Sequence, residues 1–521
     1  MIVRLLIAAL LALTALAPAT AAELVIGLGA DVTSIDPHNN NAAPNNSIAE
    51  QIFNKLIEND AQQKPKPGLA ESWQTIDDLT WEFKLRRGVK FHDGSEFTAA
   101  DVAFSIERPG IINTPGGFTI FTRSITEKII VDPYTIRLKT ATPYPNLPID
   151  MAGLIIVSSK AAKGAVAADF DSGKATIGTG PWKFVRYIKG DRIELVRNDN
   201  YWGPKPPWDK VTFRLITSDP SRIAALLSGD VQMIEVVPPA DYANLKVNKD
   251  ITIFTTTSNR MIHLHLDSNR DKSPFVTDKA GRPLDRNPFK DARVRRAFYQ
   301  AIDIETIKTK VMRDMAAPTA LMISPLLFSG ADKLTRWPYD VAAAKQLMAE
   351  AGYPEGFELV MDCPTDRYVN DEEICQAVTA MLGRIGVKVT LNALPKAQYF
   401  EKVSPPKYDS SFNLLGWTPG SLDSWNVLAN LVICRDAKGK GGTFNFGGYC
   451  NPKIDELTRK ILVEQDTAKR DAMIGDAFRI LHDDAGMIPL HQQALAWGVT
   501  KAMQVTQRAD GHIRFAWMRK Q

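Results

Sequence analysis

The chain has few cysteines, no long apolar run beyond its N-terminal segment and little net charge. Its four cysteines form no C-x-x-C pair, which argues against a four-cysteine zinc site. No later run approaches the roughly 20 apolar residues of a membrane-spanning helix. The 63 Lys and Arg exceed the 59 Asp and Glu by only +4, without a basic tract. Nucleic acid is therefore not an expected partner.

Familiar catalytic motifs are absent as well. The chain has no G-x-S-x-G and no H-E-x-x-H, and Gly173-Lys174 lacks the glycine spacing of a P-loop. His263 and His265 share one face of a presumed strand and could begin a metal site, or they could be hinge or core residues. No third ligand is visible near them in the sequence. We therefore predict neither an enzyme nor a protein that needs a metal or another cofactor.

The N-terminus has the layout of a secretory signal peptide. Arg4 precedes an apolar run from Leu5 to Leu16, and small residues lead up to Ala22. We predict that residues 1–22 are removed and that the mature protein is soluble and periplasmic. Disulfides persist in such an oxidising compartment. Proximity along the chain predicts two of them, Cys363–Cys375 and Cys434–Cys450.

What remains is an ordinary globular composition, 45% hydrophobic and 23% charged. About 500 residues exceed what one core usually serves, so we expect two or more domains. Apolar strands alternate with capped helices, which predicts α/β layering. Ser47 and Glu50 fit a capping box that would start a helix at Ser47. Thr98 and Asp101 repeat the pattern for a helix predicted to end before Pro109.

One loop stands out as a candidate ligand site. Asp362–Gln376 lies between a predicted strand and a predicted amphipathic helix. Asn370 or Asp371 suits the N-cap of that helix. Arg367 and Tyr368 have no evident role in forming the turn, so they are available to face a ligand. The alternative is an ordinary surface arginine beside a partly buried tyrosine.

A series of long motifs in one order carries a family resemblance. They are GLAESW, WEFKLRRGVKFHDG and TAADVAFSIER, followed by Ile177–Gly203, Arg222–Gln232, Phe289–Asp303, Ala342–Phe357 and Asn451–Ile461. The chain resembles the family-5 (cluster C) extracytoplasmic solute-binding proteins of ABC transporters, the group of dipeptide, oligopeptide and nickel receptors. The resemblance covers nearly the whole mature chain.

The resemblance implies a two-lobed α/β periplasmic-binding-protein fold with a hinge of two crossing segments. Lobe I would comprise 23–266 and 490–521, with an additional subdomain at about 60–177, and lobe II would comprise 267–489. A monomer of this kind captures a small solute between its lobes and delivers it to an inner-membrane ABC permease. No covalent chemistry is implied.

The resemblance also suggests site residues. Dipeptide receptors carry an arginine in the strand-to-helix loop that pairs with the peptide carboxylate, and this position matches Arg367. Its loop neighbours Asp366, Tyr368 and Asn370 are further predicted contacts. They are joined by Trp417, which offers a rigid apolar face, and by Asn46 of a polar lobe-I loop; core packing and a turn are the respective alternatives.

One family feature is missing. The acid that grips the peptide amino group in such receptors would align near Gly420, where this chain has none. Asp423 could take over that role, or it could cap the helix that begins at Ser424. The expected solute is a short peptide or peptide-like compound. Opine-like conjugates, sugar-phosphate conjugates, murein fragments and metal chelates remain alternatives, and a secreted hydrolase is disfavoured.

Overall fold

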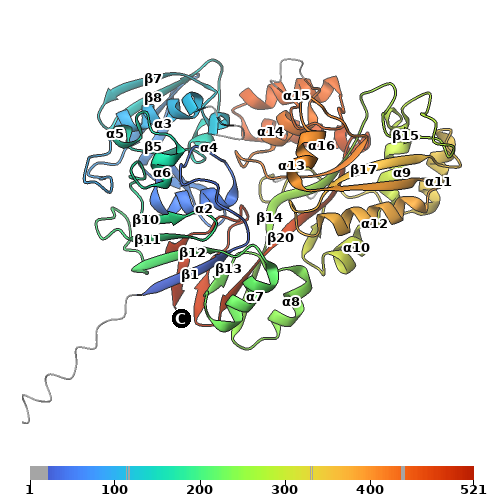
Figure 1. Ribbon diagram of the computed structural model, residues 1–521. Coiled ribbons are helices and arrows are strands. Elements are labelled where there is room, and N and C mark those ends of the chain that lie inside the picture. Colours follow the sequence, from blue (N-terminus) through green and yellow to red (C-terminus); the bar gives the residue numbers. More distant parts are fainter. Residues whose placement is uncertain are drawn as a thin grey trace, which may run out of the picture.

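The molecule has two halves joined by two long strands (Figure 1). The structure is a computed structural model, and it describes residues 22–112, 114, 118–328, 330, 333–435 and 441–520. Apart from Ala22, the predicted signal peptide lies outside these residues. Within them, every helix is too short or too polar to cross a membrane.

The first half is built on five strands of a mixed sheet. Their spatial order is β10 (Trp182–Ile188), β11 (Arg192–Arg197), β12 (Lys210–Leu215), β1 (Glu23–Leu28) and β13 (Met233–Ile234). β1 is parallel to β12 and β13, while β10 and β11 are antiparallel to their neighbours. This half also contains α2 (Ala43–Ile52), α5 (Ser159–Ala162), α6 (Ala167–Asp171), α7 (Asp219–Ser228) and α8 (Pro239–Lys246), with the C-terminal pair β21 (Met503–Val505) and β22 (Met518–Lys520).

A smaller unit with its own core is inserted in this half. Its antiparallel sheet has the order β5 (Ala70–Asp77), β6 (Thr80–Leu85), β8 (Thr135–Thr140) and β7 (Ile125–Asp132), and α3 (Ala99–Ile112) and α4 (Leu147–Met151) accompany it. Short pairs β2 (Asn54–Lys55) with β9 (Ile155–Ile156) and β3 (Ile57–Asn59) with β4 (Pro65–Pro67) border it. A separate cluster of buried apolar side chains fills the unit. The predicted limits of the additional subdomain, about 60–177, stay a prediction.

The second half continues the same 12-stranded sheet. Its strands are β15 (Val276–Thr277), β16 (Ala316–Pro318), β17 (Glu358–Pro364), β18 (Lys388–Leu394) and β19 (Phe412–Trp417). Its helices are α9 (Ala292–Ala301), α10 (Ile304–Thr306), α11 (Val341–Glu350), α12 (Asp371–Gly383), α13 (Lys396–Val403), α14 (Ser424–Val427), α15 (Pro452–Val463) and α16 (Thr467–Asp483).

Two long antiparallel strands, β14 (Ile251–Leu266) and β20 (Ile488–Thr500), connect the halves. β20 pairs with β13 of the first half, and the C-terminal part of β14 pairs with β19 of the second. Their register shifts between Thr257 and Met261. The lobe limits at 266 and 490 stay predictions. Since Ile262–Leu266 packs in the core of the second half, we propose that the chain crosses earlier, near the register shift.

Two predicted helix ends are wrong. α2 begins at Ala43 rather than at Ser47, because Pro44 fits the first turn of a helix. Ser47 Oγ instead accepts the N–H of Ile513, and Glu50 pairs with Lys55. α3 continues through Pro109 to Ile112, because a proline so near the end removes only one hydrogen bond of the last turn. Both predicted disulfides, Cys363–Cys375 and Cys434–Cys450, are present.

Candidate functional site

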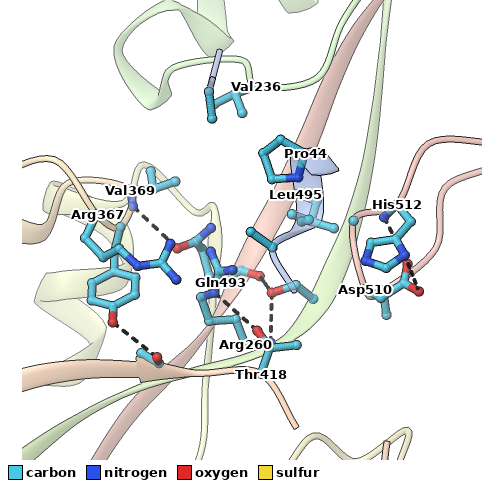
Figure 2. A pocket seen from close by; sticks show the side chains of 18 of the residues that line it. Pro44, Val236, Arg260, Arg367, Val369, Thr418, Gln493, Leu495, Asp510 and His512 are labelled. Carbon is cyan, nitrogen blue, oxygen red and sulfur yellow. Dashed lines mark hydrogen bonds and ion pairs between the residues drawn. The ribbon is translucent and has the colours of Figure 1, made fainter. Parts of the chain in front are cut away.

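A cavity of about 1340 Å³ lies between the two halves. The first half contributes Asn41–Pro44, Asn46 and Arg508–His512 to its lining, and the second half contributes Asp366–Asn370 and Leu415–Gly420. Figure 2 shows part of this lining from close by. Residues distant in sequence therefore face one space, which is where a two-lobed protein can contact a solute from both sides.

The loop between β17 and α12 is held by its own acids. The Asp371 carboxylate accepts the backbone N–H groups of Arg367 and Tyr368, each at 2.9 Å. Asp366 Oδ1 accepts the N–H of Lys396 at 2.6 Å, and Asn370 Nδ2 donates to the Val311 carbonyl at 2.9 Å. The disulfide Cys363–Cys375 joins the strand to the helix. These contacts fix the loop backbone without using the Arg367 side chain.

Arg367 presents its guanidinium group to the cavity. Its Cζ lies 5.2 Å from the ring centroid of Tyr368, whose hydroxyl donates to the Gly416 carbonyl at 3.2 Å. Burial raises the pKa of Tyr368, so this hydroxyl stays protonated. Among the described residues, no side-chain acceptor or acid pairs with Arg367. A planar guanidinium group without such a partner can bind a carboxylate or phosphate bidentately.

Two further cavity residues were not predicted from the sequence. Arg260, on β14, has Nε 3.3 Å from Thr418 Oγ1 and forms no ion pair with any described residue. Gln493, on β20, accepts the N–H of Val369 with Oε1, which leaves its amide NH₂ available. The one sequence signal was the polar run Thr255–Arg260, which lies between the apolar residues Phe254 and Met261 of the strand.

Asp423 does not line the cavity. Its carboxylate caps α14 by accepting the N–H of Trp425 at 2.8 Å, and both its oxygens pair with Arg470 at 2.7 and 2.9 Å. Asn146 of the first half also donates to it, at 3.2 Å. Of the two roles that the sequence left open, the structure therefore shows the N-cap. These contacts already use both carboxylate oxygens.

The remaining predicted residues lie in the cavity wall but are partly used by the fold. Trp417 Nε1 donates to Asn426 Oδ1 at 3.1 Å, and its ring lies 4.8 Å from that of Phe444. Asn46 Nδ2 donates to Asn41 Oδ1 at 2.9 Å. Asp366, Arg367, Tyr368 and Asn370 lie in the wall too. Whether each contacts a ligand stays a prediction.

The histidine pair on β14 is a core feature. His265 Nδ1 accepts the N–H of Gly447, so its Nε2–H donates to His263 Nε2 at 2.9 Å. The second nitrogen of His263 then donates to the Met261 carbonyl. Both rings are buried and neutral, and burial lowers the pKa of His263 to about 4. No group of three metal-ligating side chains occurs in the parts of the chain that the structure describes.

Comparison with known proteins agrees with this geometry. The family described as "Bacterial extracellular solute-binding proteins, family 5 Middle" matches residues 64–439. The chain belongs to this family. The family prediction made from the sequence motifs is thereby confirmed. The family consists of solute-binding proteins of transporters rather than enzymes.

Individual members of the solute-binding family match over most of the chain. The Glutathione-binding protein GsiB of Escherichia coli O1:K1 is 26% identical over 479 residues, 90% of this chain and 89% of that protein. The Heme-binding protein A of Haemophilus influenzae is 28% identical over 481 residues, 85% of this chain and 82% of that protein.

A solved structure supports the fold. The periplasmic binding protein DppA of Helicobacter pylori, in complex with the peptide STSA, has a TM-score of 0.77 at 22% identity, covering 96% of this chain and 98% of that chain. The predicted two-lobed α/β fold is confirmed.

Proposed function

We propose that this solute-binding protein is the periplasmic receptor of an ABC importer and that it captures a short, anionic peptide or peptide-like solute between its lobes. The mature chain, freed of residues 1–22, would bind as a monomer, close on the solute and present it to an inner-membrane permease. Hinge closure of this kind needs only a higher affinity of the closed form for the solute.

The observation that carries the proposal is the unpaired Arg367 guanidinium in the wall of a cavity shared by both halves. A cavity of about 1340 Å³ exceeds the ~300–1,000 Å³ common for small-molecule pockets, so it has room for a short peptide. The E. coli relative named for glutathione adds support, because glutathione is a peptide with two carboxylates and one ammonium group.

A second candidate is a non-peptide anion. Asp423, the acid closest in sequence to the missing amino-gripping position, is already used by Arg470 and by the cap of α14. A solute without a free ammonium group would not need that acid. Opine-like and phosphate-bearing conjugates belong to this class.

Thermal unfolding of unfolded-and-refolded protein tests the proposal, since refolding removes bound solute. The probes are glutathione, Ala-Ala-Ala, N-acetyl-Ala-Ala-Ala and C-amidated Ala-Ala-Ala. A probe at 100 times its Kd should add about 2.7 kcal/mol of stability. We expect the probes with free carboxylates to raise the Tm and the amidated peptide to fail.

The matched variants are Arg367→Gln and Arg282→Gln. Arg282 is exposed, pairs with Asp278 and does not line the cavity, so its loss controls for the change in net charge. Arg367→Gln should remove the Tm increase, and Arg282→Gln should leave it intact. Equal shifts from free and amidated peptides, or full binding by Arg367→Gln, would refute the carboxylate role.

A further inference from the structure

Arg260 and Arg367 approach the same aromatic ring from different parts of the chain. The Arg260 Cζ lies 6.0 Å from the ring centroid of Tyr368, and the Arg367 Cζ lies 5.2 Å from it. One arginine comes from the strand that crosses between the halves, and the other comes from the loop after β17. Figure 2 shows both on the same side of the pocket as Gln493.

The backbone of β14 is arranged to direct Arg260 into this place. The pairing of β14 with β20 shifts register between Thr257 and Met261. There the Arg260 N–H donates a hydrogen bond to Ser258 Oγ at 3.1 Å instead of to the partner strand. Ser258 Oγ in turn donates to the Gln493 carbonyl at 2.6 Å. An irregularity of this kind re-aims a side chain that a regular strand would place elsewhere.

No acid of the described chain neutralises the two guanidinium groups. The loop acids Asp366 and Asp371 are used by backbone N–H groups. Asp510 pairs with Arg508 and His512, and Figure 2 places Asp510 and His512 on the other side of the pocket. Arg260 is partly buried and Arg367 is exposed, and two like charges beside one ring repel each other until an anion binds both. Burial and the charge of Arg367 lower the pKa of Arg260 to about 10, consistent with this repulsion.

We infer that Arg260, Arg367 and the Gln493 amide form one anion seat that takes a doubly charged acidic end of the solute. Two guanidinium groups carry two positive charges, and two negative charges balance them, either as two carboxylates or as one phosphate group. Gln493 adds a neutral donor, since its Oε1 is already used by Val369. This inference rests on the proposed function and narrows it, since one carboxylate would leave one of the two positive charges without a counter-charge.

Matched pairs of probes test the seat by isothermal titration calorimetry. The pairs are Ala-Glu with Ala-Gln, glutathione with its glycine amide, and phosphoserine with serine. In the wild-type protein, we expect the more acidic member of at least one pair to bind at least ~10-fold tighter. The two peptide pairs test a preference for a second carboxylate, and the last pair tests a preference for a phosphate group. The pair with the largest affinity ratio therefore identifies which acidic group the site binds.

Arg260→Gln separates this inference from the proposed function. We expect it to remove the preference for the more acidic probe while a peptide with one carboxylate still binds through Arg367. Its solute-free Tm should equal or exceed that of the wild type, because a like-charge contact is gone. A residue with only a structural role would lower the Tm instead. Arg282→Gln is again the control for net charge.

Each outcome decides one question. If Arg367→Gln abolishes peptide binding but Arg260→Gln keeps the preference, the seat fails and the proposed function stands. If only phosphoserine shows an Arg260-dependent preference, the seat stands and the peptide assignment fails. If no acidic probe binds the wild type better than its neutral partner, the seat is overturned.

Discussion

At the scale of single residues, some charged side chains near the cavity hold the fold together, and others in its wall remain available for a solute. Asp371 and Asp423 are fully used, by backbone N–H groups and, for Asp423, by Arg470. Among the described residues, no acidic side chain forms an ion pair with Arg260 or Arg367. Residue type alone does not distinguish the two classes, since both contain charged side chains in neighbouring loops.

Asp423→Ala is expected to destabilise the protein by about 3 kcal/mol. It removes an N-cap and leaves the largely buried Arg470 without its acid. Urea unfolding measures the loss. Asp423→Asn keeps a cap acceptor and should retain part of the stability. A double-mutant cycle with Arg470→Gln should give a coupling energy well above zero. Weaker peptide binding by Asp423→Asn with unchanged stability would instead place Asp423 in the ligand site.

At the scale of elements, the unit that matters is β17, its loop and α12. The strand ends at Pro364, the helix begins at Asp371, and the disulfide between Cys363 and Cys375 ties the two together. Arg367 sits at the middle of this closed segment. The same sequence segment therefore contains the proposed binding residue, Arg367, and the disulfide that braces its loop.

Replacing Cys363 and Cys375 by serine is expected to cost about 3 kcal/mol in unfolding free energy, from the loss of a short covalent loop. Probe affinity should fall as well, because the Arg367 loop loses one tether. Urea unfolding and calorimetry give the two values. The stability difference between wild type and variant should disappear in dithiothreitol, where the wild-type disulfide is also reduced. A difference that persists in reductant would contradict the assignment to the disulfide.

At the scale of the whole molecule, buried or largely buried histidines lie in the first half and on the two connecting strands. Burial lowers the pKa of His38, His92 and His263 to about 4 and that of His491 to about 3. It also lowers the pKa of His265. The unfolded chain would bind protons on these rings near pH 6.5, and the folded protein does not.

Stability is therefore expected to fall as the pH drops from 6.5 toward 4. The folded-state pKa values lie below the unfolded ones, so unfolding takes up protons in this window. Over the two pH units from 6.5 to 4.5, each ring contributes at most about 3 kcal/mol, from ~1.4 kcal/mol per pKa unit. Urea midpoints between pH 7.5 and 4.5 measure the slope. His263→Leu with His265→Leu should make it shallower, and an equal midpoint at pH 7.5 and 5 would disprove the prediction.

Much of the fold followed from neighbours in sequence. Three features each lie within one continuous segment: the strand-to-helix loop around Arg367, each pair of disulfide partners, and each family motif. Such features can be predicted from the order and spacing of neighbouring residues. The start of α2 was misplaced even though it is local. Two competing signals, Pro44 and the Ser47–Glu50 pattern, occur within one helix, and the contacts of Ser47 and Glu50 with the C-terminal segment favour the first.

The sequence alone thus determined the class of protein and the loop that carries Arg367, and it predicts that the protein is exported. Only the tertiary structure decided which charges pair. Asn146 and Asp423 meet across 277 positions of sequence, and Arg260 reaches Tyr368 only because β14 shifts register where it crosses between the halves. Whether a charged side chain is free to bind a solute depends on which distant groups the fold brings within hydrogen-bonding distance. Local sequence patterns do not predict these long-range contacts.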